Sequence, residues 1–324
     1  MKKILVVQPI HPEALSIFDQ RKDIIYEVIT DFTPANLLSK VSDADAITVR
    51  DAPLPVEVLA AAPKLKVVSR HGVGYDNIPV DYCTERGVPV TVVGDVNSVS
   101  VAEHAIYLML GAARLGSQLD AAVRSGSFAA RAKLVGVELR GRRLLVVGYG
   151  RIGRETATRA EGLGMQVHVF DPFADRTRLP GTRFVETLEE GLKLADVLTL
   201  HLPLTDTTRN LIDARALALM PAGAIVINTA RGGIIDEAAL LAALDSGHIR
   251  AAGLDTFLVE PLPMGDPLAA SSRVLLTPHS AALTEESLIA MGVMTARNAL
   301  AALDGALDPE LVVNRSVLEG KVHA

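Results

Sequence analysis

The sequence contains a single cysteine, Cys83, among its 324 residues. One thiol cannot form an internal disulfide, and this scarcity is typical of a protein that works in a reducing cytosol. No apolar run approaches the roughly 20 residues that cross a bilayer. The apolar stretch at 4–7 follows two lysines but is too short for the core of a signal peptide, and it is typical of a first strand. We therefore expect a cytoplasmic protein outside the membrane, with Cys83 packed in a core.

Positive charge is not in excess. The chain has 32 Lys and Arg against 38 Asp and Glu, so its formal net charge is -6. This balance provides no general attraction to nucleic acid or to an anionic membrane, and we expect neither as a partner. An anionic substrate must therefore be held by local cations. No metal is expected.

Short apolar runs alternate with longer amphipathic segments along the whole chain. Continuous apolar runs are typical of strands buried on both faces, and helices between them imply parallel crossovers. We therefore predict an α/β fold of doubly wound, Rossmann-like parallel sheets. The expected strands are 4–7, 46–49, 66–68, 90–93, 143–147, 166–170, 197–200, 224–227 and 274–277.

The length suggests two domains of about 150 residues each, and two long predicted helices suggest where the chain crosses between them. One helix is expected at about 100–115, where Ser100 and Glu103 have the spacing of a capping box. The other is expected to start near Thr284. A complete nucleotide-binding pattern lies between the two helices. We predict a discontinuous substrate-binding domain, 1–98 with 285–324, and an inserted NAD-binding domain, 99–284.

A glycine-rich turn stands between the predicted strands 143–147 and 166–170. Gly148 permits a tight turn, Gly150 lets a pyrophosphate approach the backbone, and Gly153 lets the following helix pack closely on the strand. The start of that helix favours phosphate. Asp171 ends the second strand, where a carboxylate accepts from the ribose of NAD and repels the extra phosphate of NADP. The pattern predicts NAD as the cofactor, bound by Gly148, Gly150, Arg151, Ile152, Gly153 and Asp171.

Three later segments, 228–236, 253–261 and 276–283, complete a wider pattern. With the glycine turn and the segments 70–77, 97–104 and 201–205, they make nearly the whole chain resemble the D-isomer-specific 2-hydroxyacid dehydrogenases. This resemblance implies an NAD-dependent oxidoreductase that acts on a small (R)-2-hydroxy acid or its 2-keto acid, such as hydroxypyruvate, glyoxylate or 3-phosphoglycerate. It also implies a homodimer that pairs through the segment 101–139.

The resemblance maps a catalytic trio onto Arg231, Glu260 and His279. Oxidation of a 2-hydroxy acid removes a hydride from carbon and a proton from the hydroxyl. Histidine titrates near neutral pH and suits that proton exchange. A paired carboxylate favours the charged imidazole, and arginine presents a planar fork to a substrate carboxylate. The resemblance adds four further cofactor-binding residues, Pro203, Thr229, Ala230 and Asp255, the last expected to touch the nicotinamide.

Arg50 and Arg70 each follow a predicted strand, where ligands bind in doubly wound sheets. Because their counterparts in phosphoglycerate dehydrogenases help to hold phosphate, we predict a second polar or anionic group on the substrate. Ion pairs with Asp51, Asp76 or another carboxylate of the same domain are the alternative for both arginines. The N–H groups around 73–74 are expected to hold the substrate carboxylate. The predicted substrate-binding residues are Arg50, Arg70, His71, Val73, Gly74, Arg231 and His279.

The residues after the predicted base depart from the family pattern. Many family members have His-Ile-Gly-Gly after a Thr-Pro pair, whereas this chain has His279-Ser-Ala-Ala282. These side chains narrow the space beside the base, so the choice of substrate is open.

A corepressor-type protein that senses NAD(H) shares the architecture and is the alternative to an enzyme, and turnover distinguishes the two. A formate-dehydrogenase-like reaction needs no base paired with a carboxylate, so Glu260 argues against it.

Overall fold

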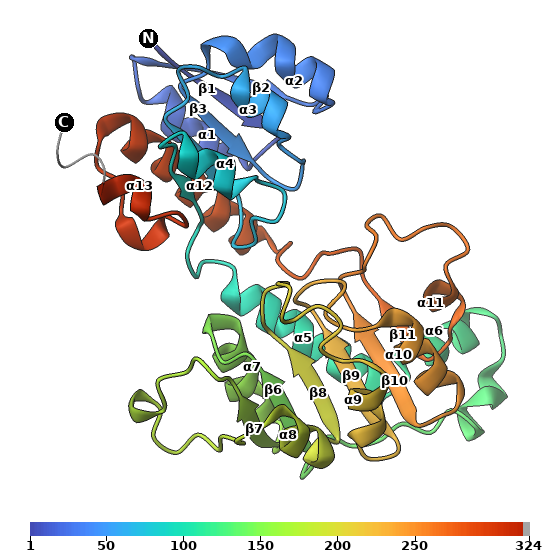
Figure 1. Ribbon diagram of the computed structural model, residues 1–324. Coiled ribbons are helices and arrows are strands. Elements are labelled where there is room, and N and C mark those ends of the chain that lie inside the picture. Colours follow the sequence, from blue (N-terminus) through green and yellow to red (C-terminus); the bar gives the residue numbers. More distant parts are fainter. Residues whose placement is uncertain (320–324) are drawn as a thin grey trace. The chain divides into compact units, whose positions relative to one another are not determined.

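The structure, a computed structural model, describes residues 1–319 and divides into two compact units. One unit joins Met1–Asn97 to the chain from Leu283 onward, and the other is Ser98–Ala282. Each unit has its own parallel sheet with helices on both faces (Figure 1). The predicted α/β fold of two doubly wound sheets, the first in a discontinuous unit, is confirmed.

The discontinuous unit has a five-stranded sheet in the order β2-β1-β3-β4-β5. Successive residues of β1 point to opposite faces. Ile4 and Val6 pack with α1 and α12, whereas Leu5 and Val7 pack with α2, α3 and α4. The strands are β1 (Lys2–Val7), β2 (Ile24–Ile29), β3 (Ala46–Val49), β4 (Val67–Arg70) and β5 (Val90–Thr91). The helices are α1 (Pro12–Asp19), α2 (Pro34–Lys40), η1 (Val41–Asp43), α3 (Val56–Ala60), α4 (Val80–Glu85), α12 (Glu285–Asp304), η4 (Pro309–Leu311) and α13 (Ser316–Glu319).

The second unit has a six-stranded sheet in the order β11-β10-β9-β8-β6-β7. A single parallel bridge from Val169 to Phe184 extends it beyond β7. The strands are β6 (Arg143–Val147), β7 (Gln166–Phe170), β8 (Val197–Leu200), β9 (Ala224–Asn228), β10 (Ile249–Leu254) and β11 (Val274–Leu276). The helices are α5 (Ser98–Ala113), α6 (Gly116–Arg124), η2 (Phe128–Ala132), α7 (Arg151–Gly162), η3 (Arg176–Arg178), α8 (Leu188–Leu194), α9 (Ala214–Leu219), α10 (Glu237–Asp245) and α11 (Pro267–Ala270).

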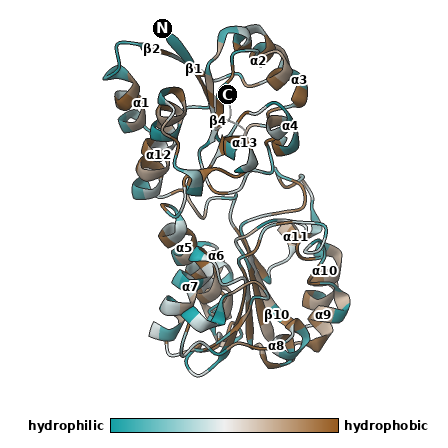
Figure 2. Cartoon of the chain, turned by 60° about the vertical axis from the view of Figure 1, so that its left-hand side comes forward, coloured by the Kyte–Doolittle hydropathy of each residue, from teal (hydrophilic) through white to brown (hydrophobic). Residues whose placement is uncertain are grey.

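This sheet is hydrophobic on both faces, as Figure 2 shows by its brown strands between two layers of helices. Leu144 and Val146 of β6 pack with α5 and α7, whereas Leu145 and Val147 pack with α8, α9 and α10. A strand buried on both faces explains why the apolar runs of the sequence are continuous rather than alternating.

Two strands, β2 and β10, are absent from the predicted set. β2 lies at the edge of its sheet, and only its end residues Ile24 and Ile29 are buried. β10 consists largely of small residues, which give little apolar signal. They are small because α5 lies against this strand: a Cβ added at Gly253 would lie 2.8 Å from Leu108 Cβ.

The starts of α5 and α12 test the two predicted helix caps. The capping box at Ser100 is wrong, because α5 begins at Ser98 and Ser100 lies buried inside its first turn. Thr284 does cap the last long helix, with its hydroxyl accepting from Ser287 N at 3.2 Å.

Cys83 is buried in the core of the first unit, as predicted, and burial raises the pKa of its thiol to about 11. Within residues 1–319, no helix is both long and apolar enough to cross a membrane.

The close packing of α7 on β6 depends on Gly153, where a Cβ would lie 2.1 Å from Gly148 O. Gly153→Ala is therefore expected to lower the free energy of unfolding by about 1–3 kcal/mol, because the backbone must shift. Gly162 ends the same helix, and a Cβ there meets nothing within 4 Å. Gly162→Ala should be neutral, or stabilising by up to about 1 kcal/mol. Urea unfolding of both variants measures the difference, and equal destabilisation would contradict this account.

Candidate active site

The glycine turn lies at the point where the order of strands reverses. β7 lies on one side of β6, and β8 lies on the other. Connections diverge there and leave a crevice beyond the carboxyl ends of the strands, where open α/β sheets bind ligands. A Cβ added at Gly150 would meet nothing within 4 Å, so the backbone is open to a ligand at this position. The first N–H groups of α7, from Arg151, Ile152 and Gly153, have no acceptor within the helix and favour phosphate.

Asp171 follows β7 and is fixed beside this turn. Its carboxylate accepts from Tyr149 N and from Phe173 N, both at 2.8 Å. Each carboxylate oxygen can accept a further hydrogen bond, so a ribose hydroxyl can still be bound.

The other predicted cofactor residues lie at the same edge of the sheet. Pro203 follows β8, and Thr229 and Ala230 follow β9. The hydroxyl of Thr229 is buried and has no hydrogen-bond partner in the described part of the chain. A buried polar group without a partner costs about 1–3 kcal/mol. This hydroxyl, the open backbone at Gly150 and the carboxylate of Asp171 together fit a dinucleotide.

The three predicted catalytic residues follow three neighbouring strands. Arg231 comes after β9, Glu260 after β10 and His279 after β11, and the sheet order is β11-β10-β9. Because the strands are parallel, their carboxyl ends meet at one edge, and this edge also carries the glycine turn. The structure brings Glu260 and His279 into direct contact, with His279 Nδ1 at 2.7 Å from Glu260 Oε2.

Glu260 and His279 are oriented by hydrogen bonds, and each favours the charged form of the other. Glu260 Oε1 also accepts from Phe257 N at 2.9 Å, which fixes the carboxylate. Since Nδ1 of His279 is bound to Glu260, Nε2 is the ring atom left for proton exchange. The hydrogen bond to Glu260 raises the pKa of His279 against the opposing effect of burial. Burial acts to raise the pKa of Glu260, but the bonds from His279 and Phe257 N outweigh it, and its pKa is lowered.

Arg231 is held by the turn that follows β9. The side chain of Asn228 accepts from Ala230 N at 3.0 Å and donates to Arg231 O at 2.8 Å. The next residue, Gly232, lies directly against the loop that carries Glu260: a Cβ there would lie 1.9 Å from the carbonyl carbon of Phe257. Only glycine allows this approach. The charge of Arg231 helps to lower the pKa of Glu260, and it partly opposes the rise that Glu260 causes in the pKa of His279.

Asp255 anchors the loop that carries His279. Its carboxylate is fully buried and accepts from Thr277 Oγ1 at 2.6 Å, Ser280 N at 2.8 Å and Ala281 N at 2.9 Å. Its carbonyl accepts from His279 N at 2.8 Å, and His279 has a left-handed backbone with φ 49°. These bonds show Asp255 as a support of the loop. Its predicted contact with the nicotinamide stays a prediction.

The polar contacts of His104 could not be predicted from the sequence. His104 Nε2 lies 2.9 Å from Thr277 Oγ1 and 3.5 Å from Asp255 Oδ1. His104 and Thr277 are 173 positions apart in the sequence, and no spacing predicts their contact. Asn228 and Gly232 were likewise not singled out, although both shape the turn of Arg231.

The remaining predicted substrate residues belong to the other compact unit. Arg50 follows β3, and Arg70, His71, Val73 and Gly74 end or follow β4. Among residues 1–319, the N–H groups of Val73 and Gly74 have no acceptor, so this loop fits a carboxylate. Arg70 makes the ion pair that was raised as its alternative: its Nη2 lies 3.0 Å from Asp51 Oδ1.

Comparison with known proteins decides the family. Residues 106–281, which contain the glycine turn and the catalytic trio, match the model of the D-isomer specific 2-hydroxyacid dehydrogenase NAD binding domain. A glyoxylate reductase of Aeropyrum pernix is 37% identical over 329 residues, which cover 98% of this chain and 97% of that protein. This chain belongs to the D-isomer-specific 2-hydroxyacid dehydrogenase family.

Two other comparisons agree with this result. A D-3-phosphoglycerate dehydrogenase of Methanocaldococcus jannaschii is 43% identical over 317 residues, or 97% of this chain. The chain spans only 60% of the length of that relative. The crystal structure of the TT0316 protein of Thermus thermophilus superposes with a TM-score of 0.88 at 35% identity, covering 96% of this chain and 99% of that one.

The contact between Glu260 and His279 predicts how the pKa of His279 changes when Glu260 is replaced. Glu260→Gln should lower the pKa of His279, because a neutral amide stabilises the imidazolium less than a carboxylate does. Glu237→Gln is the matched control, since Glu237 Oε1 accepts from Leu258 N at 2.6 Å in the same loop but makes no hydrogen bond to His279 within residues 1–319. NMR titration of the histidine resonances, with His279→Ala to assign the signal, measures both. An unchanged pKa in Glu260→Gln, or an equal fall in the control, would remove Glu260 from this role.

Proposed function

We propose that the protein is an NAD-dependent D-2-hydroxyacid dehydrogenase that interconverts a small (R)-2-hydroxy acid and its 2-keto acid. The observation that carries this proposal is the 2.7 Å pair of His279 and Glu260 at the sheet edge that also carries the dinucleotide turn. A proton-exchanging group and a hydride carrier are the two requirements of this reaction. The relatives named as phosphoglycerate dehydrogenase and glyoxylate reductase support the same class.

Each residue of the trio has a role in the proposed reaction. The bound nicotinamide supplies the hydride in reduction and accepts it in oxidation. His279 gives a proton from Nε2 to the carbonyl oxygen during reduction and takes it from the hydroxyl during oxidation. Glu260 stabilises the charged imidazole and fixes its orientation. Arg231 binds the substrate carboxylate with its planar fork and polarises the carbonyl.

The substrate is held at both ends in this proposal. The N–H groups of Val73 and Gly74 bind its carboxylate, and the residues after β3 and β4 receive the group at its other end. Hydroxypyruvate, glyoxylate and phosphohydroxypyruvate all satisfy these requirements. The two relatives differ in this respect, since one is named for a phosphorylated substrate and the other for an unphosphorylated one.

NAD rather than NADP is the proposed cofactor. The carboxylate of Asp171 would repel the extra phosphate of NADP. The two arginines that follow are already engaged, since Arg176 pairs with Glu186 at 2.7 Å and Arg178 pairs with Asp175 at 3.1 Å. Neither offers an uncompensated charge to a phosphate.

We also propose that the protein works in the cytoplasm as a homodimer. The segment 101–139 carries four large apolar side chains that are more than half exposed: Tyr107, Val123, Phe128 and Val135. Apolar side chains gathered in one segment are typical of an interface. The single buried thiol is compatible with a reducing compartment.

Replacing the base tests the proposed function. His279→Ala should reduce the turnover of NADH with short 2-keto acids by about 10²–10⁴-fold, because general acid catalysis is lost. NADH binding, measured by fluorescence, should stay within about twofold, because His279 is assigned to the substrate rather than to the dinucleotide. His248→Ala is the control, since its Nε2 lies 3.0 Å from Leu217 O, away from the proposed chemistry. Equal activity of the two variants would reject the assignment.

The preference for NAD depends on one charge. NADH should bind more tightly than NADPH, and Asp171→Asn should narrow the ratio of their dissociation constants by about tenfold or more, since like-charge juxtaposition costs several kcal/mol. Glu161→Gln removes an exposed carboxylate from α7 and should leave the ratio unchanged. Fluorescence titration with both cofactors measures it. Tighter NADPH binding by the unaltered protein would overturn the proposal.

A further inference from the structure

The carboxyl edge of the five-stranded sheet has its own reversal of strand order. β1 lies between β2 and β3, so the connections diverge after β1 and after β3. The crevice that forms at such a reversal is where open α/β sheets bind ligands. Here it is bordered by Gln8 and Pro9 after β1, by 50–52 after β3, and by 70–74 after β4.

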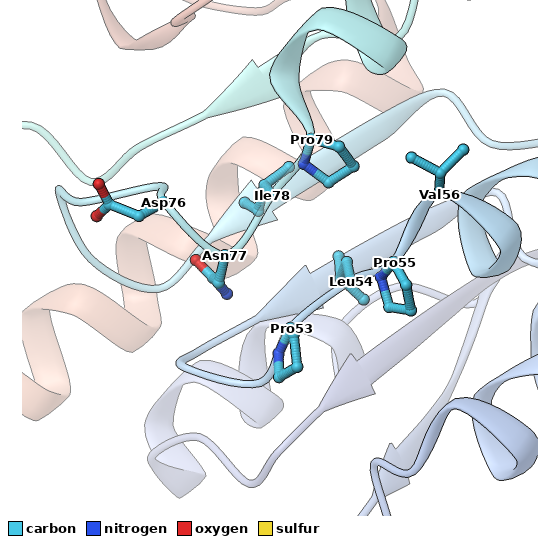
Figure 3. A pocket seen from close by; sticks show the side chains of 8 residues that line it. All are labelled: Pro53, Leu54, Pro55, Val56, Asp76, Asn77, Ile78 and Pro79. Carbon is cyan, nitrogen blue, oxygen red and sulfur yellow. The ribbon is translucent and has the colours of Figure 1, made fainter. Parts of the chain in front are cut away.

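The segment 50–52 is fixed from both sides. Asn77 Nδ2 donates to Arg50 O at 2.9 Å and to Ala52 O at 2.8 Å, and Ala52 N donates to Gln8 Oε1 at 2.7 Å. Figure 3 shows Pro53, which directly follows this segment, and Asn77 among the residues of 53–56 and 76–79 that line a hollow. Asp51, between the fixed residues, is therefore held in place at this edge, with its side chain 68% exposed.

The guanidinium group of Arg70 binds to its own loop and to Asp51. Its Nε donates to Gly74 O at 2.7 Å, its Nη1 donates to His71 O, and its Nη2 pairs with Asp51 Oδ1 at 3.0 Å. Only 11% of its side chain is exposed. Arg70 thus shapes the loop of the carboxylate-binding N–H groups, and Asp51 compensates its charge.

Within the described part of the chain, Arg50 differs from Arg70 in that it makes no ion pair. Arg50 donates from Nη1 to Pro9 O at 3.1 Å, and its buried Nε has no partner among residues 1–319. His71 is only 4% exposed, and its Nε2 likewise lacks a partner in the described chain. Burial, and then the charge of Arg50, lower the pKa of His71 to about 4, so the imidazole is neutral near pH 7. Arg50, Arg70 and Asp51 together contribute a single positive charge.

We propose that Asp51 determines substrate specificity by limiting this edge to a neutral or singly charged group, so that hydroxypyruvate is preferred over its phosphate ester. This inference rests on the proposed function. A phosphate monoester carries about 1.5–2 negative charges at pH 7. At this edge it would meet a net charge of only one, because the exposed carboxylate of Asp51 offsets one of the two arginines. A hydroxyl group carries no charge and meets no such repulsion.

The test compares hydroxypyruvate with phosphohydroxypyruvate as substrates, using NADH and the ratio of their kcat/KM values. The unaltered protein should favour hydroxypyruvate by about tenfold or more. Asp51→Asn keeps an oxygen for Arg70 but removes the charge, and it should move the ratio by about tenfold or more towards the phosphate ester. Asp51→Ser should move it in the same direction, and the shift should shrink as ionic strength rises.

Glu57→Gln is the matched control. Glu57 lies exposed on α3 and has no side-chain bond or ion pair within residues 1–319, so this variant should leave the ratio unchanged. NADH binding confirms that each variant is folded. A protein that favours the phosphate ester, or Asp51 variants that change both kcat/KM values by the same factor, would overturn the role of Asp51. A protein that reduces neither substrate nor any other short 2-keto acid would instead contradict the proposed function itself.

Discussion

The buried carboxylate of Asp255 is the contact on which the candidate active site depends. A buried charge is costly unless hydrogen bonds from the protein replace those from water. Here a hydroxyl and two backbone N–H groups provide these hydrogen bonds. All of these donors belong to the loop that follows β11. Burial acts to raise the pKa of Asp255, yet the bonds from His104, Thr277 and the loop lower it, so the carboxylate stays charged. The loop is thereby held in the one shape that presents His279 to Glu260.

The parallel sheet supplies the rest of the geometry. Residues that follow β9, β10 and β11 are far apart in the sequence but meet because these strands are neighbours with a common direction. The glycine turn after β6 opens at the same edge. The candidate site residues therefore lie on loops, while the strands below them are apolar. This division explains why the site residues are polar exceptions that directly follow continuous apolar runs.

Much of the fold could be predicted from the sequence because strands buried on both faces are continuous apolar runs. β3, β6, β7 and β8 have the predicted bounds for this reason. The prediction fails where burial is partial, as in β2, or where a helix requires small residues, as in β10. Local signals can also mislead: Ser100 has the spacing of a cap, but the helix starts at Ser98.

The candidate site could likewise be predicted only in part from the sequence. The glycine turn and Asp171 follow from physical reasoning about the sequence, whereas the trio came from resemblance, since no spacing reveals that Glu260 and His279 touch. The contact of His104 with Thr277 and the ion pair of Arg70 with Asp51 depend on which strands become neighbours, and that is a property of the folded sheet. Charge compensation is decided at this level, so two arginines in the sequence can amount to one net charge in the structure.

Transfer of deuterium tests the central claim most directly, because it separates an enzyme from a protein that only senses NAD(H). The protein is incubated with hydroxypyruvate and NADH that is deuterated at both positions of the nicotinamide carbon that carries the hydride. The product is analysed by NMR and by chiral chromatography. The account predicts one deuterium on the carbon that bears the new hydroxyl, in the (R) product only. Tight binding of NADH with no deuterium in any product, from hydroxypyruvate or from a panel of other short 2-keto acids, would contradict it.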